Sequence, residues 1–308
     1  MPYAPSRAIS RPPSIARGGE DLSARGEHLS ARGEDLCALL GFWRRSRQTE
    51  RMPVALLDHD DTGVGQTVCL LHSGVTDRRM WAGLRSALPN GLRVIAADLR
   101  GFGGTPMPAP DFSYTDAEDV ASLLDAAGIS AATVVGSSLG GRVALELATT
   151  RPDLVSSLVL LCAGYRGVDP TGTVLAFGAE EDRLLNAGDI DGAVALNVDV
   201  WLAPDASGAV RESVRVMQRR AFDLQLTEPE HPGPDQIEVD PSTIDVPALV
   251  VIGEQDFDHF IAVGEHLAAA MPRARLVRLP WAGHLPALER PSETAALVTS
   301  WLYDMGSI

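Results

Sequence analysis

The segment Gly136-Ser137-Ser138-Leu139-Gly140 places a serine hydroxyl between two glycines, with Ser138 at the centre of the pattern G-x-S-x-G. An apolar run precedes the pattern and a helix-like stretch follows it, so it lies between a predicted strand and a predicted helix. A sharp turn at such a junction strains the central residue and holds its hydroxyl above the sheet edge, while the glycines let strand and helix approach closely. Ser138 is therefore the candidate nucleophile.

A serine hydroxyl is a poor nucleophile until a base removes its proton, so a histidine and an orienting acid must accompany it. Among the seven histidines, His284 in "WAGHLPALERP" follows the last predicted strand and is the candidate base, with His259 as its rival. Asp256, a few residues after the preceding strand, is the candidate acid. Asp258 is the alternative, and either aspartate could instead cap the following helix.

An acyl transfer also needs N–H donors for the oxygen that becomes negatively charged on attack. The backbone N–H of Leu139, at the start of the helix after the nucleophile, is one expected donor. The second is expected from the loop "HSGVTDRRMW", with the N–H of Gly74 as first choice and those of Ser73 and Val75 as alternatives.

Strands and helices alternate from residue 52 onward, which predicts a mainly parallel, doubly wound α/β sheet with helices on both faces. The candidate nucleophile, acid and base each follow a strand, at the carboxyl edge where such sheets place their sites. A capping box at 115–118 predicts a helix that stops at Gly128. The predicted strands are Thr67–Leu71, Arg93–Ala97, Ala132–Val135, Leu158–Cys162, Ala248–Ile252 and Ala274–Leu279, after a hairpin near Val54–His59.

After residue 164 the alternation breaks, since residues 165–240 carry helical periodicity and then a stretch rich in proline and acidic residues. This predicts a helical cap over the site, inserted between the core segments 52–164 and 241–308; a purely structural insertion is the alternative. Arg219-Arg220 is a candidate for receiving a substrate carboxylate, or else part of a solvated helix face. The candidates for apolar contact with substrate are Trp81, Trp201, Met217 and Phe222.

The first 51 residues differ from the rest in composition. They contain two nearly identical seven-residue repeats, "SARGEHL" and "SARGEDL", each with only one apolar repeat position and one glycine. This composition predicts a disordered tail at 1–51 rather than a coiled coil. The ordered pattern begins at Met52, which we expect to be the biological start.

The formal charge of −15 is unevenly spread, because residues 1–51 hold nine arginines against six acids and leave 18 net negative charges on the remainder. Such a body repels nucleic acid and anionic membrane, so neither is an expected partner. Three cysteines without a disulfide pattern, and no apolar run long enough for a membrane helix, fit a cytoplasmic protein. No metal- or phosphate-binding motif is present, so no cofactor and no metal are expected, and the sequence carries no signal for an oligomeric state.

The motifs "LLHSG", "ADLRGFGGT", "GSSLGG", "GEQD" and "GHLPALERP" occur in an order and spacing that resemble the α/β-hydrolase superfamily over about residues 53–308. The resemblance implies Ser138 as nucleophile, His284 as base, Asp256 as its partner and residues 165–240 as the cap. It also implies a structural role for the turn that "ADLRGFGGT" forms.

Within the superfamily, "HSGVTDRRMW" and "GHLPALERP" look most like the group of esterases, enol-lactonases and carbon–carbon hydrolases. Epoxide hydrolases and haloalkane dehalogenases carry an aspartate at the sharp turn, so Ser138 argues against both. Two departures bear on the site. His72-Ser73 replaces the usual His-Gly of the oxyanion loop, and His259 replaces a proline often found three residues after the acid.

Together these features predict a serine hydrolase that cleaves a small to medium carboxylic ester or lactone through an acyl-enzyme on Ser138. A carbon–carbon hydrolase or an acyltransferase with the same triad is one alternative. A cofactor-free oxygenase, which would depend on His284 and Asp256 more than on the serine, is another. A non-catalytic ligand receptor would keep the pocket without turnover.

Overall fold

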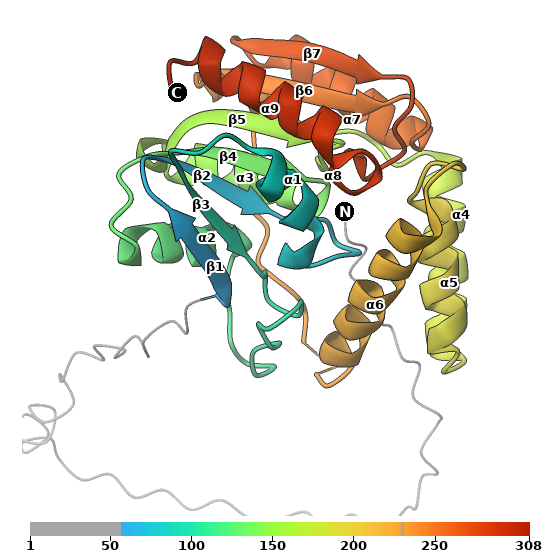
Figure 1. The fold of residues 1–308 in the computed structure, drawn as a ribbon. Coiled ribbons are helices and arrows are strands. Elements are labelled where there is room, and N and C mark those ends of the chain that lie inside the picture. Colours follow the sequence, from blue (N-terminus) through green and yellow to red (C-terminus); the bar gives the residue numbers. More distant parts are fainter. Residues whose placement is uncertain (1–56, 229–230) are drawn as a thin grey trace, which may run out of the picture. The chain divides into compact units, whose positions relative to one another are not determined.

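Seven strands form one sheet in the computed structural model, which describes residues 57–228 and 231–308. The order across the sheet is β1-β3-β2-β4-β5-β6-β7; β1 runs antiparallel to β3, and the other neighbouring pairs are parallel (Figure 1). The prediction of a mainly parallel α/β sheet is confirmed. The predicted tail, residues 1–51, and the expected start at Met52 lie outside the described residues.

The six parallel strands match the predicted apolar runs to within a few residues. Strands β4 and β6 are buried along their whole length, since the central strands of a parallel sheet are covered on both faces. The strands are β1 (His59–Gly63), β2 (Gln66–Leu71), β3 (Leu92–Ala97), β4 (Ala132–Ser137), β5 (Val155–Leu161), β6 (Ala248–Gly253) and β7 (Ala274–Leu279).

The hairpin predicted near Val54–His59 falls partly outside the described residues, which begin at residue 57. The first described strand, β1, begins at His59 and pairs with β3 rather than with β2, so that His59 lies opposite Ala97 and Gly63 lies opposite Arg93. Its sequence, HDDTG, is polar and largely exposed, as suits a strand at the edge of the sheet. Such a strand has no apolar pattern from which its position could be read.

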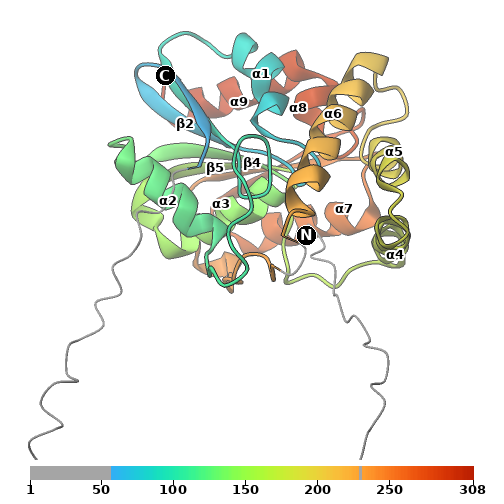
Figure 2. The same ribbon diagram turned by 90° about the horizontal axis from the view of Figure 1, so that it is seen from below.

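Helices cover both faces of the sheet (Figure 2). Helices α2, α3 and α7 supply side chains to the core on one face, and α1, α8 and α9 supply the core on the other. Besides the short 3₁₀ turns, the helices are α1 (Ala82–Ala87), α2 (Asp116–Ala126), α3 (Leu139–Thr150), α4 (Gly172–Asn186), α5 (Ile190–Val200), α6 (Gly208–Gln225), α7 (Asp258–Ala270), α8 (Pro286–Glu289) and α9 (Pro291–Asp304).

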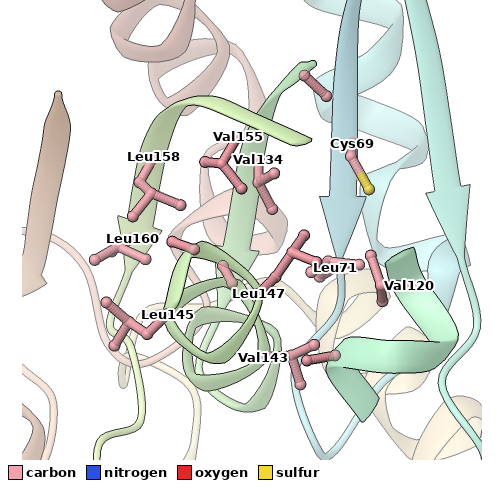
Figure 3. Packing of buried hydrophobic residues seen from close by; sticks show 14 of the residues in the cluster. Cys69, Leu71, Val120, Val134, Val143, Leu145, Leu147, Val155, Leu158 and Leu160 are labelled. Carbon is pink, nitrogen blue, oxygen red and sulfur yellow. The ribbon is translucent and has the colours of Figure 1, made fainter. Parts of the chain in front are cut away.

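The core on the α3 face is built chiefly from leucine, valine and alanine side chains (Figure 3). In Figure 3, side chains of β2, β4 and β5 meet those of α3, the helix that begins directly after Ser138. Fully burying one such side chain stabilises the fold by roughly 1.5–3 kcal/mol. The helix behind the candidate nucleophile is thus fixed by the main core of the protein.

The helix predicted from the capping box is α2, and this prediction is confirmed. Thr115 is its N-cap, and the Thr115 hydroxyl accepts a hydrogen bond from the N–H of Glu118 at 3.1 Å. Gly128 follows the helix with φ +70°, a conformation that glycine adopts without strain.

Helices α4, α5 and α6 lie between β5 and β6 in the chain and pack beside the sheet (Figure 1). Their internal contacts run chiefly between α5 and its two neighbours. We call residues 165–240, the segment that carries these three helices, the insertion. Among the described residues, no helix combines the length and the apolar character that a membrane crossing requires.

Candidate active site

Ser138 lies between the end of β4 and the start of α3, with φ +50° and ψ −109°. A residue with a side chain rarely adopts a positive φ, so the backbone is strained at Ser138, as the G-x-S-x-G pattern predicts. Hydrogen bonds hold the strained residue in place. Its N–H donates to the carbonyl of Leu161 at 3.0 Å, and its own carbonyl accepts from the N–H of Gly164 at 2.9 Å.

Two glycines of the pattern have no room for a side chain. A Cβ on Gly136 would lie 2.3 Å from the carbonyl oxygen of Gly140, and a Cβ on Gly140 would lie 2.0 Å from that of Leu71. The N–H of Gly140 also donates to the carbonyl of His72 at 2.9 Å. The nucleophile turn therefore packs directly against the loop that follows β2, where the oxyanion donors are expected.

Asp256 and His284, which follow β6 and β7, are brought together. Nδ1 of His284 lies 2.6 Å from Oδ2 of Asp256, and both side chains are about 2% exposed. The other carboxylate oxygen accepts the N–H of Phe257 at 2.7 Å, which fixes the orientation of the aspartate. With its Nδ1 proton donated to the carboxylate, the imidazole has Nε2 free to act as the base.

The two alternative residues are held elsewhere. Asp258 accepts hydrogen bonds from the hydroxyls of Thr171 and Thr173, at 2.7 and 2.5 Å, and so joins α7 to the start of α4. His259 is buried, burial lowers its pKa, and its Nδ1 has no hydrogen-bond partner among the described residues. The acid in contact with the candidate base is Asp256.

The loop after β2 carries the expected oxyanion donors. The N–H of Ser73 is 3.5 Å from Sδ of Met80 and is thereby occupied. Within residues 57–228 and 231–308, no acceptor is bound to the N–H of Leu139, Gly74 or Val75. Leu139 and Gly74 therefore fit the expected pair, with Val75 still open as the alternative to Gly74.

His72 shapes this loop from inside the core. Its Nδ1 donates to the carbonyl of Ser73 at 2.8 Å, while Nε2 accepts the N–H of Leu99 at 3.0 Å. This pattern requires the neutral imidazole, and burial lowers the pKa of His72 accordingly. The same region carries the turn of "ADLRGFGGT", where Asp98 accepts the N–H of Arg78 at 2.7 Å.

An apolar cluster surrounds His284. The imidazole centroid lies 4.6 Å from that of Trp201 and 4.2 Å from that of Phe260. We call this set the site cluster, because it joins the oxyanion loop, the insertion and the core around the candidate base. Its members include Val75, Trp201, Val214, Phe222, Phe260 and Leu285.

The four candidates for substrate contact separate into two pairs. Trp201 and Phe222 belong to the site cluster. Trp81 is fully buried in the core beneath α1 and α9, so its position is accounted for by packing. Met217 belongs to that second core and also lines a cavity of about 250 Å³ at α6.

Arg219 and Arg220 face solvent on α6 and are already engaged. Arg219 pairs with Asp191 at 2.5 Å and with Asp223 at 3.0 Å. Arg220 donates to the carbonyl of Gly103 at 3.1 Å. The solvated helix face, rather than a carboxylate receptor, describes these two residues.

Cys162 is a neighbour of the pair that the sequence does not reveal. The apolar run "LVLLCAG" predicts a buried thiol, which is confirmed, but nothing in it indicates contact with the site. Cys162 has φ +46°. Its Sγ lies within 4.8 Å of a carboxylate oxygen of Asp256 and of a ring nitrogen of His284. Burial raises its pKa well above the usual value. A soft metal ion could bind these three atoms only by ionising the thiol and displacing the proton between His284 and Asp256.

Doubly wound sheets that end one strand on a strained serine in this way are built by hydrolases of the α/β fold. The chain is one of them: residues 70–297 match the sequence model of the alpha/beta hydrolase family, and the chain belongs to that family.

Relatives and solved structures agree. A putative carbamate hydrolase of Pseudomonas savastanoi pv. phaseolicola is 31% identical over 229 residues, covering 69% of this chain and 84% of the relative. The pimeloyl-[acyl-carrier protein] methyl ester esterase of Neisseria meningitidis serogroup B is 29% identical over 273 residues, covering 82% and 96%. A thermophilic esterase from Thermogutta terrifontis superposes with a TM-score of 0.66 at 27% identity, covering 81% of this chain and 93% of that one.

Proposed function

We propose that the protein is a serine hydrolase that cleaves a small to medium carboxylic ester or lactone through an acyl-enzyme on Ser138. The observation that supports this most is the 2.6 Å hydrogen bond between His284 and Asp256, at the sheet edge that also carries the strained Ser138. The names of the relatives, which include esterases, point to the same class of substrate.

In this reaction Nε2 of His284 takes the proton of the Ser138 hydroxyl as the oxygen attacks the carbonyl carbon, and then gives it to the departing alcohol. Asp256 keeps the other imidazole proton on Nδ1 and stabilises the positive ring. The N–H groups of Leu139 and Gly74 stabilise the oxyanion. A water deprotonated by His284 then releases the acid from the serine.

We assign the insertion, residues 165–240, the role of a cap. Trp201 and Phe222 bring its apolar side chains to the cluster around His284, and Ser138 is only 5% exposed. An apolar surrounding favours an uncharged acyl or alcohol group. The contacts of Arg219 and Arg220 agree with this, because both guanidiniums already bind groups of the protein, Asp191 and the Gly103 carbonyl.

The test is Ser138→Ala, assayed with short-chain and medium-chain nitrophenyl esters and with a fluorophosphonate probe. We expect turnover to fall by roughly 10⁴-fold or more, because the residual rate would come only from binding and the oxyanion donors. Labelling should be lost altogether. The matched control is Ser137→Ala, which removes a buried hydroxyl that has no partner among the described residues.

The other possible outcomes point to the alternatives. Turnover that survives in Ser138→Ala would overturn the proposal in favour of an oxygenase-like use of the histidine–aspartate pair. A wild-type protein that is labelled by the probe but turns over no ester would favour a receptor or an acyl transfer to another acceptor. His284→Gln should abolish turnover with the fold intact, whereas His259→Gln should not.

A further inference from the structure

The carboxylate of Glu289, the last residue of α8, lies against the loop that carries His284. Its Oε2 accepts the N–H of Gly283 at 2.8 Å, and its Oε1 accepts the N–H of Leu285 at 3.2 Å. These are the residues immediately before and after the candidate base. One side chain thus holds the peptide groups on both sides of His284.

The same carboxylate also meets the insertion. The N–H of Ala203 faces it, and a Cβ on Gly283 would lie 2.6 Å from the nitrogen of Ala203 and 3.0 Å from Oε1 of Glu289. The N–H of His284 donates to the carbonyl of Trp201 at 3.2 Å. The base loop, the insertion and Glu289 therefore meet at one closely packed point.

The charge of Glu289 is of the right sign to assist the base. Burial raises its pKa, while the N–H groups of Gly283, Leu285 and Ala203 and the charge of His284 act against that rise. Both oxygens accept hydrogen bonds, which is the pattern of the ionised form. Opposite charges attract in a buried setting, so an ionised Glu289 would favour the positively charged form of the His284 ring.

We propose that Glu289 is a positioning residue for the base: it fixes the two peptide groups that flank His284, at the point where Ala203 of the insertion approaches them. The proposal rests on the proposed function, since it applies only if His284 is the base. A catalytic group displaced by about 1 Å costs on the order of 100-fold in rate. Loss of the two hydrogen bonds from Gly283 and Leu285 to Glu289 should therefore lower kcat.

The test is Glu289→Gln, which keeps the size of the side chain but turns one acceptor oxygen into an NH₂ group that faces an N–H donor. We expect kcat to fall by roughly 10- to 100-fold while KM changes by less than about twofold, because the geometry of the base and not the binding surface is altered. Fluorophosphonate labelling of Ser138 should slow in parallel. The control is Glu293→Gln, an exposed glutamate near Arg290 on α9, which should leave kcat unchanged.

A second variant keeps the outcome decisive. Glu289→Asp retains the charge but is one methylene shorter, so it cannot reach both N–H groups, and we expect an intermediate kcat; it replaces Glu289→Gln if circular dichroism shows that variant unfolded. An unchanged kcat with a lower melting temperature would overturn the proposal and leave a structural brace. A change confined to KM would overturn it as well. If turnover requires Ser138 but not Glu289, only the positioning role fails, because Ser138→Ala decides the proposed function separately.

Discussion

Trp201 contacts His284 through both its side chain and its backbone. The centroids of the indole and imidazole rings are 4.6 Å apart, and the Trp201 carbonyl accepts the backbone N–H of His284 at 3.2 Å. Trp201 comes from the insertion and His284 from the loop after β7. A single residue of the insertion thus contacts both the ring and the backbone of the candidate base. The insertion therefore helps to hold the candidate base in place.

Trp201→Ala should weaken both activity and stability. Loss of the indole opens a cavity beside the imidazole, and truncation of a buried tryptophan costs about 3–5 kcal/mol. We expect kcat/KM to fall by at least about tenfold, because the ring that packs on the base is gone. Urea unfolding and steady-state kinetics measure the two effects.

Trp201→Phe separates the ring from its hydrogen bond. The phenyl ring still packs on His284, but the 2.8 Å bond from the indole N–H to Oδ1 of Asn197 is lost. Leaving a buried acceptor without its donor costs about 1–3 kcal/mol, so stability should fall while kcat/KM stays close to that of the wild type. A Trp201→Ala protein with the kcat/KM of the wild type would show that the Trp201 ring does not support His284.

Asp256→Asn and Asp258→Asn should differ sharply. Asparagine at 256 keeps the shape of the side chain but cannot balance an imidazolium, so kcat should fall by roughly 10³- to 10⁴-fold. Asp258 accepts hydrogen bonds from Thr171 and Thr173 and makes none with His284, so its variant should keep kcat. Initial rates with a nitrophenyl ester decide between them; equal losses would return the acid to an open choice.

Much of the fold follows from the sequence because buried parallel strands read as continuous apolar runs. For this reason the apolar runs predict β4 and β6 nearly to their ends. The sequence does not predict β1, because its HDDTG segment lies at the exposed edge, where only pairing with β3 defines a strand. Pairing is a relation between distant segments and leaves no local pattern.

The site divides in the same way. The strained turn at Ser138 could be predicted because it requires glycines at fixed positions around that residue. Glu289 and Cys162 could not, because they contact the base loop through backbone groups: the N–H groups of Gly283 and Leu285, and the carbonyl of Gly283, to which Cys162 Sγ donates at 3.6 Å. Peptide groups are the same at every residue, so only the folded chain shows which ones converge.

Cys69 and Cys162 should resist alkylation in the native protein. Burial raises the pKa of Cys69 to about 12 and that of Cys162 well above the usual range, so neither is a thiolate at about pH 8. We expect iodoacetamide to modify their two peptides only after unfolding in urea, as measured by mass spectrometry. Native labelling of the Cys162 peptide would contradict the burial of that thiol.

The same two thiols should make the fold less stable in alkaline solution. Both folded pKa values are raised, and an unfolded thiol ionises near about pH 8.5. Above that pH the unfolded chain loses protons that the native chain retains, so their contribution to stability is present below it and declines as the pH rises towards the folded values. The free energy of unfolding in urea, followed from neutral to alkaline pH, should decrease less in Cys69→Ala.

Arg142→Met should be strongly destabilising although it touches no proposed catalytic group. Arg142 lies one turn after Ser138 in α3, and its guanidinium binds Glu146 at 2.6 Å and Asp116 at 2.9 Å, with all three side chains at most 6% exposed. Methionine would fill the space but leave two buried carboxyl groups without this partner. Breaking a buried ion pair by removing one member costs about 3–5 kcal/mol.

The pH dependence of that loss identifies its cause. Burial raises the pKa of Glu146, and the guanidinium of Arg142 opposes the rise, so the pKa of Glu146 should climb further in Arg142→Met. A carboxyl whose folded pKa is raised favours folding while it is protonated, and this contribution is lost as the pH rises through the folded value. The deficit measured by urea unfolding should therefore be larger at about pH 7 than at about pH 5.

Arg151→Met is the control, since that exposed arginine binds Asp125 and Asp153 at the surface and its loss should cost less than about 1 kcal/mol. Equal deficits in the two variants, or a deficit independent of pH, would show that the buried charges beside the nucleophile helix do not need Arg142.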